Sequence, residues 1–322
     1  MNGRLGDLIQ TIPVINQYVE EKKPKQLDCI SAHDRIVLLK GVVPIDNFLG
    51  RWDGKYVYPE PNMQTRVLYN VYICDYTRII NSDPGHTYAT AFSSKHMMEH
   101  QARLFGLDTF KYKQPNFNIT KEEKSYAKSL LPQTKKPIVL IHTSWLGRPP
   151  YGRALAAPFW NELIQRCPEI VFIQVGVVRG GIHGTDLNLM KSDGGGDWLD
   201  YKIPTTKKTP NFIDIRSKTT VRQVIALLGM VDTFIVVDSW VNHISKLINK
   251  SGIALFGSSS ANVFGYDHNI NIWHNPRGCA PCIDRPETNP NDDCCQKDGI
   301  NTITVDEVIK TLKKRLDNNI RI

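Results

Sequence analysis

Residues 219–259 read TTVRQVIALLGMVDTFIVVDSWVNHISKLINKSGIALFGSS, and this stretch decides the fold. Two apolar runs, TFIVV at 233–237 and GIALF at 252–256, alternate with segments of helical periodicity at 219–230 and 240–249. Strands that are apolar almost throughout, each next to a helix, are typical of a parallel sheet covered by helices on both faces. The stretch therefore predicts an α/β fold.

The same alternation extends in both directions from this stretch. PIVLIHT at 137–143 and IVFIQVGV at 170–177 are predicted strands, with a helix at 158–166 between them and a last helix at 305–316. The N-terminal part predicts a helix at 8–19, with Pro13 in or near its first turns, and helices at 93–105 and 121–131. Its predicted strands are QLDCIS at 26–31, PIDNFLG at 44–50 and RVLYNVYICDY at 66–76.

The length of the chain predicts two domains. Its 322 residues are too many for one comfortable core and fit two α/β domains of about 150 residues each. A polar, aperiodic stretch between residues 108 and 136 is the expected linker, which gives domains at 1–120 and 121–322. The fractions of hydrophobic residues, 41%, and of charged residues, 22%, are those of an ordinary globular protein.

Composition also bounds the location and the partners. The sequence shows neither an apolar run long enough to span a bilayer nor a signal-peptide pattern, so we expect a cytoplasmic protein without a disulfide framework. The formal net charge of +8 favours anionic partners such as nucleotide phosphates, acidic glycolipid or nucleic acid. Because Lys and Arg are spread along the chain, a solvated surface with a mild basic excess explains the charge equally well.

The ends of the predicted strands hold the candidate site residues, because open parallel sheets bind ligands beyond the carboxyl ends of their strands. Asp238 and Ser239 follow the strand TFIVV and precede a helix whose first N–H groups could bind a diphosphate. His243 lies in the first turns of that helix. The alternative is that Asp238 and Ser239 only cap the helix.

Two further segments are candidates of the same kind. The loop after PIVLIHT carries Ser144, Arg148 and Arg153, and arginine side chains grip phosphate oxygens in bidentate fashion. Near the start of the chain, Gly3-Arg4-Leu5-Gly6-Asp7 precedes an amphipathic helix and could form a backbone-lined pocket that contains a carboxylate. A solvated loop and a plain N-cap by Asp7 are the alternatives.

Read together and in order, these segments resemble glycosyltransferase family 9, the family of the ADP-heptose:lipopolysaccharide heptosyltransferases. The resemblance covers almost the whole chain. The matching segments are GRLGDLIQTIPVIN, IVLIHTS, RALAAPFWNELIQRCPEIVFIQVG, DIRSKTTVRQVIALLGMVDTFIVVDSWVNHISKLINKSGIALFGSS and CAPC with TVDEVIKTL.

The resemblance implies a GT-B architecture, in which two Rossmann-like domains with parallel sheets face each other across a cleft. It implies an inverting reaction without a catalytic metal, with the acceptor on the N-terminal domain near Arg4 and Gly6. The family's Gly-Asp pair matches Gly6-Asp7, so Asp7 is the candidate general base. The nucleotide-sugar, ADP- or UDP-linked, would bind to the C-terminal domain, with Arg153 in the place of the family's phosphate-contacting lysine.

The chain departs from the family pattern at two places. Asp238, Ser239 and His243 match the family's Asp-Thr-Gly-x-x-His pattern, but Trp240 stands where the family has the glycine that lets the backbone approach the phosphates. Family members also have a strand before the Gly-Asp turn, whereas only six residues precede Asp7. Either the start given for the chain is late, or that edge of the sheet is completed differently.

A cluster of four cysteines, Cys279, Cys282, Cys294 and Cys295, predicts a structural Zn or Fe site. Four thiolates leave no open coordination position, so the metal would have no catalytic role. The alternative is a set of reduced thiols, since adjacent cysteines are awkward as paired ligands of one ion.

The sequence thus predicts an inverting glycosyltransferase that moves a hexosyl, heptosyl or pentosyl group from a nucleoside diphosphate to a hydroxyl. The acceptor could be a glycan, a protein or modified DNA, and a phage-type enzyme acting on a hydroxylated base is a variant of this hypothesis. Two competing hypotheses are a GT-B-shaped binding protein that has lost catalysis and a nucleotide-sugar epimerase of the same fold.

Overall fold

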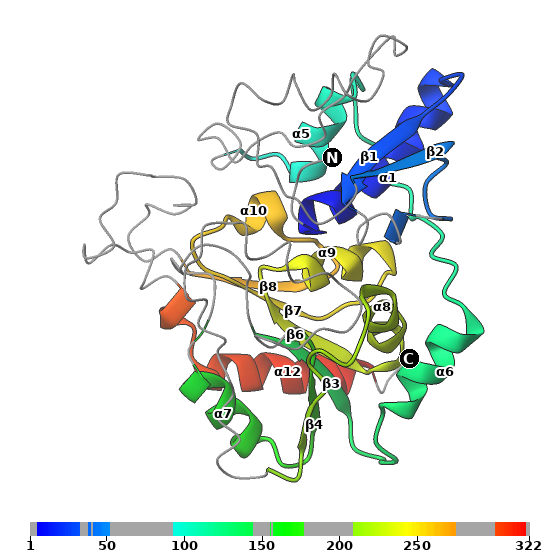
Figure 1. Cartoon of the computed structure of the whole chain (residues 1–322). Coiled ribbons are helices and arrows are strands. Elements are labelled where there is room, and N and C mark those ends of the chain that lie inside the picture. Colours follow the sequence, from blue (N-terminus) through cyan, green and yellow to red (C-terminus); the bar gives the residue numbers. More distant parts are fainter. Residues whose placement is uncertain are drawn as a thin grey trace.

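The computed structural model describes residues 5–32, 38–39, 41–51, 93–143, 155, 157–176, 209–274 and 300–319. The N-terminal half contributes helix α1 (Leu5–Lys22) and a parallel pair of strands, β1 (Asp28–Ala32) and β2 (Asn47–Arg51). Helices α5 (Met97–Leu104) and α6 (Lys121–Ser129) follow. Figure 1 shows α1, β1, β2 and α5 together on one side of the larger sheet of the C-terminal half.

The C-terminal half is built on six parallel strands in the order β5-β4-β3-β6-β7-β8. These strands are β3 (Ile138–His142), β4 (Val171–Gln174), β5 (Phe212–Asp214), β6 (Thr233–Val237), β7 (Ile253–Phe256) and β8 (Ile270–Trp273). The chain runs outward from β3 to β5, then returns to the centre at β6 and runs outward again to β8. This is the Rossmann strand order, and its topological switch point lies between β3 and β6.

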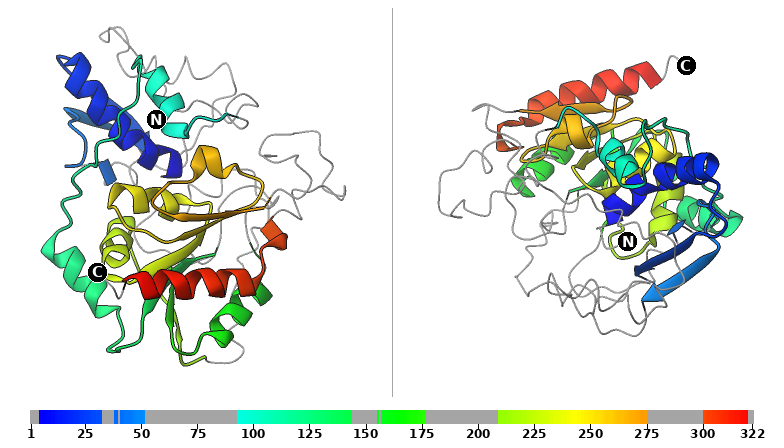
Figure 2. Two further views of the ribbon diagram at one scale, coloured as in Figure 1. Left: turned by 180° about the vertical axis from the view of Figure 1, so that it is seen from behind. Right: turned by 90° about the horizontal axis from the view of Figure 1, so that it is seen from above.

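Helices cover both faces of this sheet, as the apolar strands predict. Helices α7 (Ala157–Arg166) and α12 (Val305–Asn319) pack on one face through Trp160, Leu163, Val308 and Leu312. Helices α8 (Val221–Met230) and α9 (Trp240–Leu247) pack on the other face. Figure 2 shows α12 lying across the first face, on the side opposite to α9. Two shorter helices, α10 (Ala261–Phe264) and the 3-10 helix η3 (Ile300–Thr302), complete the described elements.

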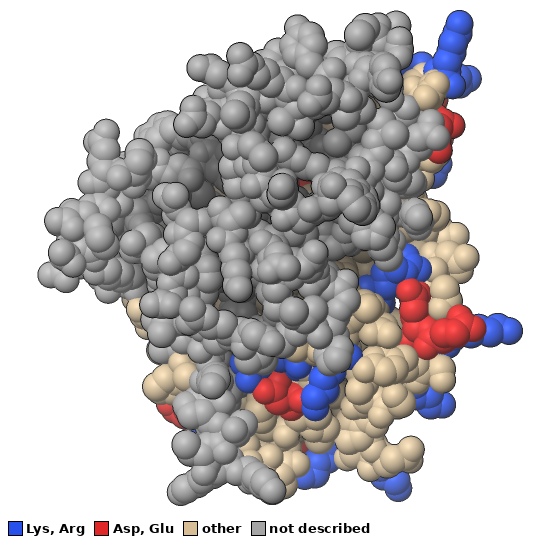
Figure 3. All heavy atoms as spheres, viewed as in Figure 1, with Lys and Arg blue, Asp and Glu red and all other residues tan. Residues whose placement is uncertain are grey.

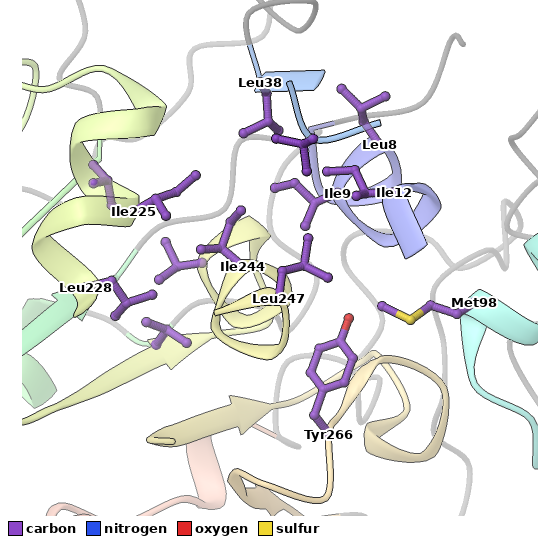
Figure 4. Packing of buried hydrophobic residues seen from close by; sticks show 14 of the residues in the cluster. Leu8, Ile9, Ile12, Leu38, Met98, Ile225, Leu228, Ile244, Leu247 and Tyr266 are labelled. Atoms are coloured by element: carbon purple, nitrogen blue, oxygen red, sulfur yellow. The ribbon is translucent and has the colours of Figure 1, made fainter. Parts of the chain in front are cut away.

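One hydrophobic core joins the two halves of the chain. Residues of α1, including Ile9 and Ile12, belong to the same buried cluster as Ile244 and Leu247 of α9 and Leu228 of α8. Figure 4 shows these side chains packed together, with α1 lying directly above α9. The N-terminal half is therefore held against the α8–α9 face of the large sheet by apolar burial, which stabilises a fold by roughly 25 cal/mol for each Å² of apolar surface buried.

Local sequence signals account for where the helices begin and end. Thr120 and Thr220 each form a capping box, with Glu123 and Gln223 respectively. Helix α5 begins at Met97, later than the expected residue 93, because the side chain of His96 caps it. It ends at a Schellman motif in which Gly106 has φ +71° and Leu107 N donates to Ala102 O at 3.0 Å.

The structure confirms most of the predicted elements and adds to them. Strands β5 and β8 and helix α10 were not predicted, because short segments such as FID and INIW carry little periodicity. Pro13 lies well inside the 18-residue helix α1, further from its start than expected. The predicted strand at 66–76 lies outside the described residues.

The linker region contacts the C-terminal half rather than crossing open solvent. Arg222 of α8 donates to Glu123 of α6 at 2.6 Å and to the carbonyl of Asn118 at 2.7 Å. The domain boundary at residue 120 stays a prediction. None of the described helices is long and apolar enough to cross a membrane, and the cytoplasmic location also stays a prediction.

The shared core predicts that the two halves unfold together. Ile9→Ala should lower the free energy of unfolding by about 2–5 kcal/mol, because it opens a cavity in a fully buried contact. Amide hydrogen exchange should accelerate in α9 as well as in α1. Leu104→Ala, at a leucine that is 38% exposed, is the control and should change stability little. Faster exchange confined to α1 would contradict a shared core.

Candidate functional site at the strand ends

The switch point of the large sheet places the carboxyl ends of β3 and β6 side by side. Strand β3 pairs with β6 up to His142 and Val236, so the residues that follow both strands emerge at one edge. Thr143 follows β3, and Asp238 and Ser239 follow β6. In Rossmann-type sheets this edge, at the reversal of strand order, is where ligands bind.

Three buried polar atoms at this edge have no hydrogen-bond partner among the described residues. They are His142 Nδ1 at the end of β3, Gln174 Oε1 at the end of β4 and Ser239 Oγ after β6. The three side chains are 5%, 1% and 6% exposed. Since an unsatisfied buried polar group costs roughly 1–3 kcal/mol, three on neighbouring strands indicate a site prepared for a polar ligand or ordered water.

Ser239 occupies the N-cap position of α9, but its side chain makes no capping hydrogen bond. Its hydroxyl is therefore not used in the way that a capping role requires. Asp238 is buried and accepts a hydrogen bond from Ser259 Oγ, on the loop after β7. The structure thus fixes the carboxylate of Asp238 and leaves the hydroxyl of Ser239 available at the start of a helix, where N–H groups favour anions.

The first turn of α1 lies against the first turn of α9. A Cβ atom added at Gly6 would lie 2.9 Å from His243 Cδ2, 3.3 Å from His243 Nε2 and 3.9 Å from the Cα atom of Trp240. Only glycine permits this approach without displacing the imidazole ring. Gly6 therefore lies against the first turn of α9, which contains His243 and follows Asp238 and Ser239. Asp7 is the next residue of α1.

A buried polar network holds His243 in place. Gln10 Nε2 donates to His243 Nδ1 at 3.0 Å, and the hydroxyl of Tyr266 lies 3.0 Å from the same nitrogen. His243 thus shares one polar cluster with Gln10 of α1 and with Tyr266 of the loop before β8. His96 of the α5 cap stacks on Tyr266 with 4.8 Å between ring centroids. Burial, with the charges of His243 and Lys246, lowers the pKa of His96 to about 3.

Trp240, the first residue of α9, packs against the neighbouring strand end. Its ring meets His142 edge to face, with 5.9 Å between centroids. Burial lowers the pKa of His142 to about 4, so this ring is neutral near pH 7. The ring of the tryptophan therefore lies beside the end of β3.

The other predicted site residues lie outside the described residues. They are Arg4, Ser144, Arg148, Arg153 and the four cysteines Cys279, Cys282, Cys294 and Cys295. Their roles stay predictions. Among the residues that the structure does describe, no group of three or more His, Cys, Asp or Glu could hold a metal ion.

Sequence reasoning missed Gln10, Tyr266 and Arg216. Gln10 could have been found, because it lies one helical turn beyond Gly6 and Asp7 on the same face of α1. Tyr266 is separated from Gln10 by 256 residues and has no local signal. Arg216, after β5, is held by Asp214 through Nε at 2.9 Å. Burial alone would raise the pKa of Asp214, but the bonds and charge of Arg216 lower it below its usual value.

The contact at Gly6 predicts a large effect from a single methyl group. Gly6→Ala should lower the free energy of unfolding by about 1–3 kcal/mol, because His243 or α1 must shift. Gly229→Ala in α8 is the matched control, since nothing lies within 4 Å of the added Cβ. The control should raise helix stability by up to about 1 kcal/mol. Equal denaturation midpoints for the Gly6→Ala variant and the wild type would contradict the contact.

Comparison with known proteins finds a family match over part of the sequence. Residues 200–292 match the model of glycosyltransferase family 9 (heptosyltransferase), and this match includes Asp238, Ser239 and His243. No curated protein matches the chain by sequence.

Solved structures match nearly the whole chain. A family 9 glycosyltransferase from Veillonella parvula DSM 2008 has TM-score 0.67 at 13% identity, with 99% of this chain and 96% of that chain covered. The ADP-heptose lps heptosyltransferase II of E. coli has TM-score 0.64 at 12% identity, with 98% and 96% covered.

The iron-containing dodecameric glycosyltransferase TibC of enterotoxigenic E. coli H10407 has TM-score 0.62 at 15% identity, with 99% of this chain and 75% of that chain covered. These likenesses confirm the α/β, GT-B class of fold. The chain is therefore similar to glycosyltransferase family 9, in sequence over residues 200–292 and in fold along nearly its entire length.

Proposed function

We propose that this chain is a glycosyltransferase of the heptosyltransferase type, which transfers a sugar from a nucleoside diphosphate to an acceptor hydroxyl. The observation that carries the proposal is the contact of Gly6, the neighbour of Asp7 in α1, with His243 and Trp240 in the first turn of α9. A carboxylate and an anion-binding helix end are the two groups that such a transfer needs. The family match supports the same function.

The donor diphosphate would bind at the start of α9. The N–H groups of the first helical turn and the hydroxyl of Ser239 would donate hydrogen bonds to its oxygens, and the helix dipole would favour its negative charge. As the bond between the anomeric carbon and the phosphate oxygen breaks, these groups would stabilise the leaving diphosphate without a metal ion. Arg148 and Arg153 are the proposed additional cations, and Ser144 a further donor contact.

Asp7 would act as the general base. Its carboxylate would take the proton of the acceptor hydroxyl while that oxygen attacks the anomeric carbon from the face opposite to the leaving group, which inverts the configuration. The backbone of Asp7 is held in place, because its carbonyl oxygen accepts hydrogen bonds from Thr11 Oγ1 at 2.7 Å and from Gln101 Nε2 at 3.0 Å. Gly6 and Arg4 would lie on the acceptor side.

The proposed donor is ADP-heptose. A second structure of TibC describes it as a heptosyltransferase in complex with ADP-D-beta-D-heptose. The matching E. coli heptosyltransferase II is an ADP-heptose lps heptosyltransferase. We accordingly propose a saccharide acceptor of the lipopolysaccharide type. The family match favours this function over a DNA-modifying enzyme, an epimerase or a protein without catalysis.

The mechanism predicts that Asp7→Asn loses catalysis but keeps donor binding. With ADP-heptose and heptose-deficient lipopolysaccharide, kcat should fall by about 10²–10⁴-fold, the usual contribution of a general base. The thermal shift produced by the donor should be unchanged.

Ser239→Ala should instead weaken donor binding about tenfold, since it removes a hydrogen bond to a charged group.

Asp108→Asn, at an exposed aspartate, is the control and should behave as the wild type. NMR of the product should show the anomeric configuration opposite to that of the donor, and EDTA should not slow the reaction. A fully active Asp7→Asn variant would disprove the role of Asp7. Donor hydrolysis with release of free sugar and no transfer would favour the epimerase instead.

We also propose that Cys279, Cys282, Cys294 and Cys295 hold a structural iron or zinc ion. Four thiolates suit these soft metals, and TibC is iron-containing. Metal analysis should find about one metal atom per chain, and Cys279→Ser should remove it. Cys167→Ser, at a buried cysteine of the C-terminal core, should retain the metal. Purified wild-type protein without iron or zinc would contradict the proposal.

A further inference from the structure

A groove lies at the opposite edge of the large sheet from the proposed active site. It has a volume of about 510 Å³ and is lined by α12 and by the amino ends of β7 and β8. Gly252 directly precedes β7, and Ile270 begins β8. Because the strands are parallel, their amino ends lie at the edge of the sheet opposite to His142, Asp238 and Ser239. No step of the proposed transfer uses this groove.

The lining of the groove is basic. Lys310, Lys314 and Arg315 line it from one side of α12, at spacings that place them on adjacent turns. Glu307 is the acidic residue of the lining, and its carboxylate already lies 3.1 Å from His274 Nε2. On the described part of the face in Figure 3, by contrast, basic and acidic side chains lie mixed. The lining of the groove therefore gathers three basic side chains and one carboxylate.

One buried polar atom on a lining residue, Arg315 Nε, has no hydrogen-bond partner in the described part of the chain. A guanidinium N–H is a strong donor that costs free energy when it is buried without an acceptor. An oxyanion in the groove would supply that acceptor, and phosphate oxygens suit arginine in particular.

We propose that this groove between α12 and the amino ends of β7 and β8 is a binding site for a phosphate group, separate from the donor site. Lys310 and Lys314 would contribute point charges at the rim, and Arg315 would hydrogen-bond the phosphate oxygens from within. The phosphate could belong to a soluble phosphorylated ligand or to the headgroup of a lipid. The exposed side chain of Ile270, at 39%, lies in the lining next to these cations.

Equilibrium dialysis with radiolabelled inorganic phosphate tests the site. Arg315→Gln should raise the dissociation constant about tenfold, as expected for loss of a hydrogen bond to a charged group. Lys314→Gln should weaken binding in the same direction. Lys313→Gln is the matched control, because Lys313 is the neighbouring lysine of α12 but pairs with Glu169 at 3.3 Å and does not line the groove. Ser239→Ala keeps the groove intact and should retain this binding even if it loses the donor.

Cosedimentation with vesicles distinguishes the two sources of the phosphate. Binding to phosphatidylglycerol vesicles but not to phosphatidylcholine vesicles, reduced by Lys314→Gln and not by Lys313→Gln, would assign a lipid headgroup. Phosphate binding without vesicle binding, with the same pattern of variants, would assign a soluble ligand. Wild-type protein that binds neither phosphate nor vesicles, or equal losses in Lys313→Gln and Lys314→Gln, would overturn the proposal.

Discussion

The contact between the first turns of α1 and α9 is the constraint on which the proposed site depends. The two helices approach so closely that a side chain at Gly6 would collide with the ring of His243. Apolar residues further along α1 continue the same contact into the core that α8 and α9 share with the sheet. Because this core is continuous, the position of Asp7 relative to the strand ends is set by packing and does not rely on a loop.

Buried polar groups gather at the carboxyl ends of the central strands. Most strand residues are apolar, and helices pack on them as in other doubly wound folds. At the ends of β3, β4 and β6 the chain buries His142, Gln174 and Ser239, each with an atom that lacks a hydrogen-bond partner among the described residues. Such groups oppose folding. When a protein buries polar groups without partners, the place is usually a functional site.

The sequence predicts the C-terminal sheet well and the site in part. Apolar runs such as TFIVV are flanked by clear helices, which begin after the N-cap residues Thr220 and Ser239. The type and order of these helices and strands therefore follow from local signals. Strands β5 and β8 are three and four residues long and are held by pairing with β4 and β7, which no local pattern reveals. The contact of Gln10 with Tyr266 depends on tertiary packing alone.

Trp240 begins α9 where the sequence pattern of glycosyltransferase family 9 led us to expect a glycine. Its indole packs edge to face on His142 at the end of β3. Burial lowers the pKa of His142, so its ring is neutral near pH 7 and adds no charge beside the start of α9. The helix end keeps its N–H groups and its N-cap hydroxyl, because neither depends on the side chain of the following residue. The backbone N–H groups and Ser239 can therefore still bind an anion there. The rings of Trp240 and His142 lie next to that position.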